Sequence, residues 1–180
     1  TLIENGVKII FTVDCGTLSF EAIDFAKSKN IDVIVLDHHQ SEIKLPKAFS
    51  VVNPNRLDDK SDLNYLCAAG VSFMFLISIN SQLRSIKWFD DNLKKEPNLL
   101  NYLDLVSLGT VCDVVPLVGL NRAIVKQGLK ISTFCLANFA LLILRISSSV
   151  LPENIDPEIT SIDPFFLFVF ILFSRNIILL

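Results

Sequence analysis

Five residues of this sequence have side chains suited to binding a divalent metal ion, and four of them follow apolar segments directly. Asp14 comes after one β-branched segment, and Asp37, His38 and His39 come together after another. These histidines are the only two in the chain. Carboxylate and imidazole groups in combination suit an ion such as Mn²⁺, with Zn²⁺ as an alternative. A lone aspartate after a strand is more often a turn former or a helix cap, so the prediction depends on the whole group.

The fifth residue, Asp113, is the sole charge in the apolar stretch 108–117. A carboxylate in such surroundings is costly unless a cation or hydrogen-bond donors satisfy it. A helix cap or a buried ion pair with Arg122 would also meet that need. Together with Asp14 and His38, however, Asp113 favours a metal site. Bound ions at such a site would activate a water molecule and neutralise phosphate charge, while a neighbouring histidine donates to a phosphate oxygen.

A strand–helix–strand unit is expected to position the first four residues. Residues 7–13 and 31–36 are typical of buried strands, and 17–29 alternate apolar and charged residues like an amphipathic helix. Such a unit implies parallel strands joined by a right-handed crossover. Ligands gather at the carboxyl ends of parallel strands. We therefore expect Asp14 and His38 to share a coordination sphere.

The remaining elements predict an α/β fold, with helices covering a mainly parallel sheet. In the first helix, Thr17 or Ser19 would be the cap, and the apolar face would consist of Leu18, Ala22, Phe25 and Ala26. Residues 48–52 are a candidate third strand, followed by a turn and a polar loop over 57–64. Helices are expected over 65–79, 98–108 (broken by Gly109) and 119–131, with a polar connector over 92–97.

Composition limits the classes of function. The net charge of −3 is unlike that of a domain that holds nucleic acid mainly by charge. The four cysteines stand far apart without paired spacing, which favours reduced, half-buried thiols in a cytoplasmic protein over a cysteine-bound zinc.

Beyond residue 131 the sequence changes character, so we expect two regions, 1–131 and 132–180. The apolar runs 134–144 and 165–173 are separated by prolines and acids. Each run is shorter than the roughly 20 apolar residues that cross a bilayer. We expect an apolar, helical tail, with an interfacial segment or a stretch foreign to the domain as alternatives.

The ordered motifs of residues 6–131 resemble the DHH phosphoesterases, and in particular their RecJ-type single-stranded-DNA exonucleases. The motifs, in chain order, are Val-Asp-Cys-Gly (13–16), Asp-His-His (37–39), Val-Asn-Pro-Asn-Arg (52–56), Ala-Gly-Val-Ser-Phe (69–73), Leu-Gly-Thr-Val-Cys-Asp-Val-Val-Pro-Leu (108–117), Asn-Arg (121–122) and Gly-Leu-Lys (128–130). Asp-His-His alone is a weak match, whereas the ordered set is specific.

The resemblance implies a site with two Mn²⁺ or Mg²⁺ ions. Asp14 would bridge them, His38 and Asp113 would ligate the second ion, and Asp37 would support the site from behind its ligands. His39 would contact the scissile phosphate. The implied reaction is hydrolysis of single-stranded DNA from the 5′ end in recombination and repair, with single-stranded DNA and repair proteins as partners and no membrane.

The sequence also departs from the family's pattern. A motif with a histidine and paired aspartates, which holds the first ion in RecJ-like proteins, does not occur here, and Leu120 replaces a usual acid. We therefore expect the chain to be a partial DHH domain that is inactive alone. Alternative interpretations are a phosphoesterase for pyrophosphate, short oligonucleotides or cyclic dinucleotides, a non-catalytic remnant or interaction module, and a membrane-surface anchor in the tail.

Overall fold

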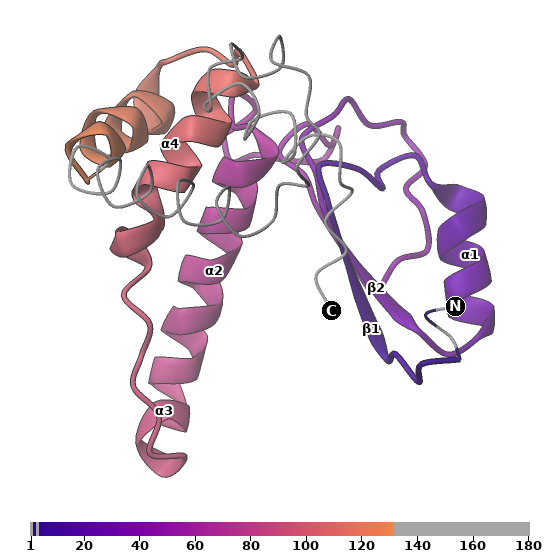
Figure 1. The fold of residues 1–180 in the computed structure, drawn as a ribbon. Coiled ribbons are helices and arrows are strands. Elements are labelled where there is room, and N and C mark those ends of the chain that lie inside the picture. The colour runs from indigo at the N-terminus through magenta and orange to yellow at the C-terminus, as the bar shows by residue number, and fades with distance from the viewer. Residues whose placement is uncertain (1, 3, 132–180) are drawn as a thin grey trace, which may run out of the picture. The chain divides into compact units, whose positions relative to one another are not determined.

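The computed structural model describes residue 2 and residues 4–131 (Figure 1). The prediction of an apolar, helical tail over 132–180 lies outside the described residues. Within them, no helix is both long enough and apolar enough to span a bilayer.

Three parallel strands form the sheet, in the order β1-β2-β3. They are β1 (Ile9–Val13), β2 (Asp32–Leu36) and β3 (Ser50–Val52). The strand–helix–strand unit and the third strand are therefore confirmed, and the fold class is α/β. The register aligns Val13 with Leu36, and Leu36 with Val52. All three strands consequently end at the same level of the sheet.

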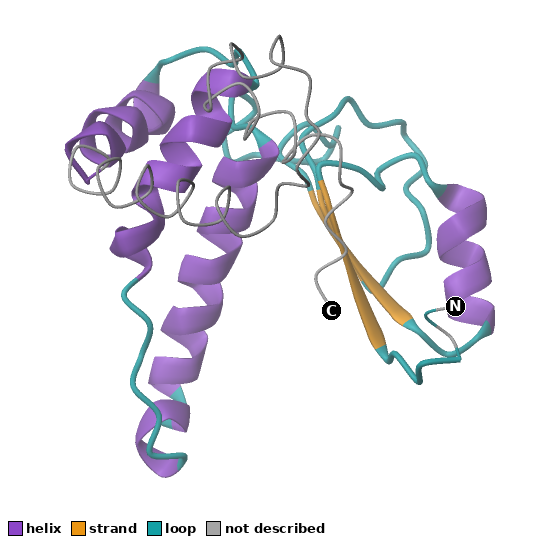
Figure 2. Cartoon of the chain, in the orientation of Figure 1, coloured by secondary structure: helices purple, strands orange, loops and turns teal. Residues whose placement is uncertain are grey.

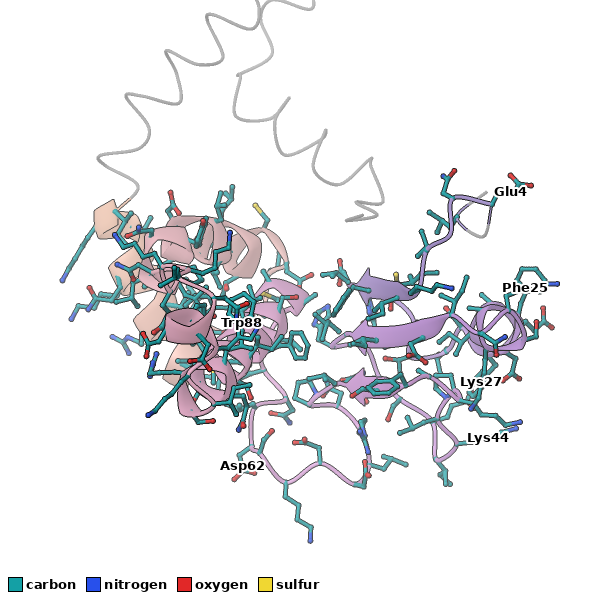
Figure 3. The ribbon with its side chains drawn as sticks, turned by 90° about the horizontal axis from the view of Figure 1, so that it is seen from below. Glu4, Phe25, Lys27, Lys44, Asp62 and Trp88 are labelled. Atoms are coloured by element: carbon teal, nitrogen blue, oxygen red, sulfur yellow. The ribbon has the colours of Figure 1, made fainter. Side chains whose placement is uncertain are left out.

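Helix α1 (Phe20–Ser28) joins β1 to β2, but it packs with a different face from the one predicted. Its buried residues are Ile23 and Ala26, which join the sheet core around Val33 and Val35. Phe25 lies on the outer side of the helix (Figure 3), where Lys29 stands 5.7 Å from the centre of its ring. Leu18 and Ala22 are exposed as well. The prediction was right for Ala26 and wrong for Leu18, Ala22 and Phe25, because the buried residues of the helix are Ile23 and Ala26, about one helical turn apart.

Strand β1 is less buried than its apolar sequence predicted. It is one of the two edge strands of the described sheet, and Ile9 and Val13 remain 50% and 37% exposed. Phe11 packs edge-on against Phe75 of the next helix, with ring centres 6.2 Å apart. The apolar run was correctly interpreted as a strand, but burial depends on neighbours that periodicity does not reveal.

The helices beyond β3 form a second layer on the side of the sheet opposite α1 (Figure 2). They are α2 (Ala68–Ser85), α3 (Trp88–Asp91), the 3₁₀ helix η1 (Leu99–Tyr102) and α4 (Leu103–Cys112). Residues 119–131 are also helical. A separate core of Phe73, Leu103, Val106 and Ile124 joins this layer. The helix predicted over 65–79 thus begins and ends later, and the one predicted over 98–108 is η1 followed by α4.

Gly109 does not break a helix, contrary to the prediction. It lies inside α4, where a Cβ atom would come 2.7 Å from the Cβ of Ala69 on α2. Glycine is present because the two helices approach closely at this point, which is a common use of its missing side chain. The helix instead ends at Cys112, with Asp113 as its C-cap residue.

Candidate metal centre

Three polar residues stand side by side where the three strands end. Asp14, Asp37 and Asn53 each directly follow the last residue of β1, β2 and β3. The ladder continues one step further, since the Asp14 N–H donates to the Leu36 carbonyl and the Asp37 N–H donates to the Val52 carbonyl, both at 3.0 Å. The aligned register therefore delivers two carboxylates and an amide to one edge of the sheet.

His38 is the residue at which the acids from distant segments meet. Its Nε2 atom lies 3.2 Å from Oδ1 of Asp14 and 3.4 Å from Oδ2 of Asp113. The structure thus brings together the three residues predicted as metal ligands. In addition, one potential ligand atom from each of Asp14, His38 and His39 lies within 4.8 Å of the other two.

Asp113 reaches this cluster from the end of α4. Its Oδ2 atom is buried and makes no hydrogen bond among the described residues, although it faces the His38 Nε2 atom at 3.4 Å. Burial raises the pKa of Asp113 above its usual value, the nearby His38 opposes this, and the Asp14 carboxylate adds to it. The alternative of a pair with Arg122 is wrong, because the ion pair that Asp113 makes within the described residues is with His38.

The backbone adopts a left-handed conformation at Asp14 and directly after Asp113. Asp14 has a φ of +64° and Val114, which follows Asp113, has a φ of +56°. Aspartate tolerates the left-handed region, but a β-branched valine rarely adopts it. Gly16 is also left-handed, at +114°, and a Cβ there would lie 2.5 Å from the Thr12 hydroxyl. Strain of this kind persists where the surrounding structure demands a particular side-chain placement.

Asp37 faces inward, toward main-chain N–H groups. Its Oδ1 accepts hydrogen bonds from the N–H of His38 at 2.8 Å and of His39 at 3.3 Å, and its Oδ2 accepts from the N–H of Thr17 at 2.9 Å. Burial alone would raise the pKa of Asp37, but hydrogen bonds from Thr17, His39 and His38 outweigh it and lower the pKa to about 2. Asp37 is therefore an ionised anchor for the loop that holds both histidines.

His39 has one ring nitrogen engaged and most of its ring exposed. Nδ1 lies 2.7 Å from Oδ1 of Asp37, and the side chain is 60% exposed. The hydrogen bond to Asp37 raises the pKa of His39, burial opposes this, and the charges of Asp37, Asp14 and Asp113 add to the increase. Because Asp37 is ionised, Nδ1 carries a hydrogen, which leaves Nε2 for another partner.

Thr17, Asn53 and Asn55 also belong to this site, although the sequence assigned them no role in it. The Asn53 amide donates to the Thr17 hydroxyl at 2.9 Å and to the His39 carbonyl at 2.8 Å. The Asn55 amide donates to the His38 carbonyl. Of the two predicted helix caps, Thr17 and Ser19, it is Ser19 that occupies the cap position of α1, although its side chain makes no capping hydrogen bond. A polar residue directly after the third strand was the signal that Asn53 belonged here.

The donor groups fit a hard divalent cation. A buried carboxylate oxygen of Asp113, the half-exposed carboxylate of Asp14 and the His38 imidazole converge on one point. Carboxylate oxygens suit Mn²⁺ and Mg²⁺, and an imidazole ligand suits transition metals, so the mixed set favours Mn²⁺, with Zn²⁺ as an alternative. Cys15 is exposed, and partial burial, then Asp37 and Asp14, raise the pKa of its thiol, which disfavours the thiolate that a soft-metal site requires. Cys67 and Cys112 are likewise free.

Comparison of the sequence with known proteins identifies one family. Residues 2–110 match the family described as DHH family, N-terminal domain. The chain is 42% identical over 125 residues to the single-stranded-DNA-specific exonuclease RecJ of Dickeya dadantii, covering 69% of this chain and 22% of the relative. The RecJ of Escherichia coli K12 gives the same identity over the same length and the same two shares.

Solved structures agree with the sequence comparison. A crystal structure of exonuclease RecJ bound to manganese superimposes with a TM-score of 0.56 at 31% identity, over 72% of this chain and 31% of that chain. The chain spans only 22% of the length of the curated relatives named above.

Proposed function

Because this chain belongs to the DHH family, we propose that it contributes to a metal-dependent hydrolase that cleaves phosphodiester bonds of single-stranded DNA from the 5′ end. The proposed setting is DNA recombination and repair. The observation that carries the proposal is the convergence of Asp14 and Asp113 on the Nε2 atom of His38. The relatives' printed names support the substrate, since those proteins are single-stranded-DNA-specific exonucleases.

The proposed metal ligands are Asp14, His38 and Asp113. Asp14 is the candidate to bridge two ions, because its carboxylate is 49% exposed and so has an oxygen free toward solvent. Mn²⁺ is the preferred candidate ion, given a structural neighbour that binds manganese, with Mg²⁺ as the alternative. When bound, such ions supply a water of lowered pKa and offset the charge that develops on the phosphate.

His39 is proposed to act on the substrate. Asp37 holds its Nδ1 atom at 2.7 Å and raises the pKa of the ring, which favours the protonated ring over the neutral one. A charged ring held in this way can donate from Nε2 to a non-bridging phosphate oxygen. Donors placed in advance toward developing charge are among the strongest contributors to catalysis.

The proposed ligands of this chain account for only part of a two-ion site. Asp14, His38 and Asp113 give three protein ligands for one ion, whereas two ions in a hydrolase need more. We propose that residues 1–131 form a partial DHH domain and that full activity requires metal ligands in addition to these three.

The direct test is hydrolysis by the protein expressed from its complete reading frame. Single-stranded oligonucleotides labelled at the 5′ or the 3′ end would be incubated with Mn²⁺, with Mg²⁺ or with a chelator. We expect early release of the 5′ label as mononucleotide, in metal ion only. Asp113→Asn keeps the side-chain size and should abolish the release, while the exposed-site variant Asp62→Asn should not change it.

The same assay separates the alternatives. Faster hydrolysis of pyrophosphate, short oligonucleotides or cyclic dinucleotides than of long single strands would replace the exonuclease by another phosphoesterase. Binding of metal ion without hydrolysis of any of these substrates would instead favour a non-catalytic interaction module.

A further inference from the structure

The His38-His39 dipeptide is held by side chains at each of its four main-chain polar groups. Both N–H groups donate to Oδ1 of Asp37. The carbonyl of His38 accepts from the Asn55 amide, and the carbonyl of His39 accepts from the Asn53 amide at 2.8 Å. Backbone groups in a loop usually pair with water or other backbone, so this arrangement fixes the dipeptide unusually firmly.

The two asparagines follow β3, the strand furthest from that of Asp14 in the described sheet. Asn53 is only 3% exposed, and both of its amide N–H donors and its amide oxygen are engaged. Its amide donates twice, to Thr17 and to the His39 carbonyl, and its Oδ1 accepts from the Asn55 N–H at 2.8 Å. An aspartate at this position would accept but not donate, so the chemistry specifies an amide.

We propose that Asn55 and Asn53 are positioning residues with separate duties. Asn55 orients His38 for the metal ion, and Asn53 orients His39 for the phosphate of the substrate. This inference rests on the proposed function, because it assigns the two histidines to metal and to phosphate.

The two asparagines have different roles because each one holds the carbonyl of a different histidine. A carbonyl that loses its donor lets its own residue move, and the ring attached to that residue moves with it. The His38 ring must meet two carboxylates, at 3.2 and 3.4 Å, so its displacement weakens metal binding. The His39 ring keeps its hydrogen bond to Asp37 at 2.7 Å, so loosening its carbonyl changes the direction of Nε2 and leaves the metal ligands in place.

The experiment compares Asn55→Ala and Asn53→Ala by two kinds of measurement. Mn²⁺ affinity and imidazole ¹⁵N NMR spectra of the metal-free protein are recorded on the 180-residue chain. The values of kcat and KM are measured on single-stranded DNA with the protein from the complete reading frame. Ser41→Ala is the matched control, because its hydroxyl donates to the Asn55 carbonyl at 3.1 Å and to neither histidine.

We expect Asn55→Ala to weaken Mn²⁺ binding by about tenfold, in line with the loss of a partner that orients a metal ligand. Asn53→Ala should leave Mn²⁺ affinity within about twofold, shift the ¹⁵N signals of His39 and lower kcat by about tenfold with little change in KM. Ser41→Ala should resemble the unmodified protein in every measurement.

Two results would overturn the proposal. One is that both asparagine variants alter affinity, spectra and kcat to the same degree, as general loosening of the loop would; the other is that neither alters them. If Asn53→Ala does not fold, Asn53→Asp keeps the volume and the acceptor but loses the donor, and the same kcat effect is expected. Should the unmodified protein fail to cleave DNA, the proposed function fails, while the Mn²⁺ and NMR measurements still test the positioning.

Discussion

The Nδ1 atom of His39 lies 2.7 Å from Oδ1 of Asp37, a carboxylate that also accepts the main-chain N–H groups of both histidines. One buried anion therefore organises the whole Asp-His-His segment. The two rings lie 4.7 Å apart and are tilted by 58°, so they face different directions from one anchored loop. This geometry separates a histidine that meets two acids from a histidine that is free to meet a substrate.

Replacing Asp37 by Asn should destabilise the protein by about 1 to 3 kcal/mol at pH 7, because N–H donors would then face an amide that cannot satisfy them all. The pKa of Asp37 is lowered from 3.8 to about 2 in the folded state. Its ionised form therefore stabilises the fold fully above about pH 4, and this contribution is lost as the pH falls through about 2. Urea unfolding at several pH values measures the difference between the two proteins.

The gap in unfolding free energy between the unmodified protein and Asp37→Asn should shrink steadily between pH 4 and pH 2. If the difference in unfolding free energy stays constant over this interval, the hydrogen bonds described above do not stabilise the ionised form of Asp37.

His39→Gln should lower kcat for single-stranded DNA by about a hundredfold, because general acid–base and electrostatic contributions of one side chain are of this order. Mn²⁺ affinity should change by less than about threefold, since the structure gives His39 no contact with Asp113 and anchors it to Asp37 instead. Steady-state kinetics together with calorimetric Mn²⁺ titration make the comparison. A large loss of Mn²⁺ affinity would make His39 a metal ligand, in agreement with its closeness to Asp14 and His38.

Gly109→Ala should destabilise the protein by about 1 to 3 kcal/mol, as overpacking of a well-packed core does. The added Cβ would come 2.7 Å from the Cβ of Ala69, and neither backbone can withdraw without moving a helix. Thermal or urea unfolding measures the loss. The double variant Gly109→Ala with Ala69→Gly should recover part of it, and a double variant as unstable as the sum of both changes would show that this contact is not the cause.

Much of the architecture could be predicted from the sequence because its signals are local. The β-branched runs before Asp14 and Asp37, with an amphipathic helix between them, determine a parallel pair of strands. Once parallel pairing is given, Asp14 and His38 must approach each other. The meeting of His38 with Asp113 could not be worked out in this way, because it depends on how α4 packs against the sheet.

The errors share one physical origin. The exposure of Ile9 in β1, the outward position of Phe25 in α1 and the continuity of α4 through Gly109 all depend on neighbours that are distant in sequence. The roles of Asn53 and Asn55 were missed for a related reason. Asparagine after a strand is a common turn residue, and only the aligned ends of β2 and β3 reveal that these amides reach the histidine carbonyls.

Asp14→Asn should weaken Mn²⁺ binding by about tenfold or more, because the substitution keeps the size of a proposed ligand but removes its charge. Calorimetric titration of the 180-residue chain measures this, with Asp62→Asn in the exposed loop as the control. Unchanged affinity in Asp14→Asn would exclude the bridging role.

Anomalous diffraction from crystals of the chain grown with Mn²⁺ would test most directly whether the aspartate after β1 and the first histidine after β2 bind a common ion. We predict a manganese peak within bonding distance of both an Asp14 carboxylate oxygen and the His38 Nε2 atom, with Asp113 close to it. The metal site and the proposed hydrolase activity would both be contradicted by a peak that contacts only one of the two residues. The absence of a peak between them in a crystal grown with saturating Mn²⁺ would contradict them as well.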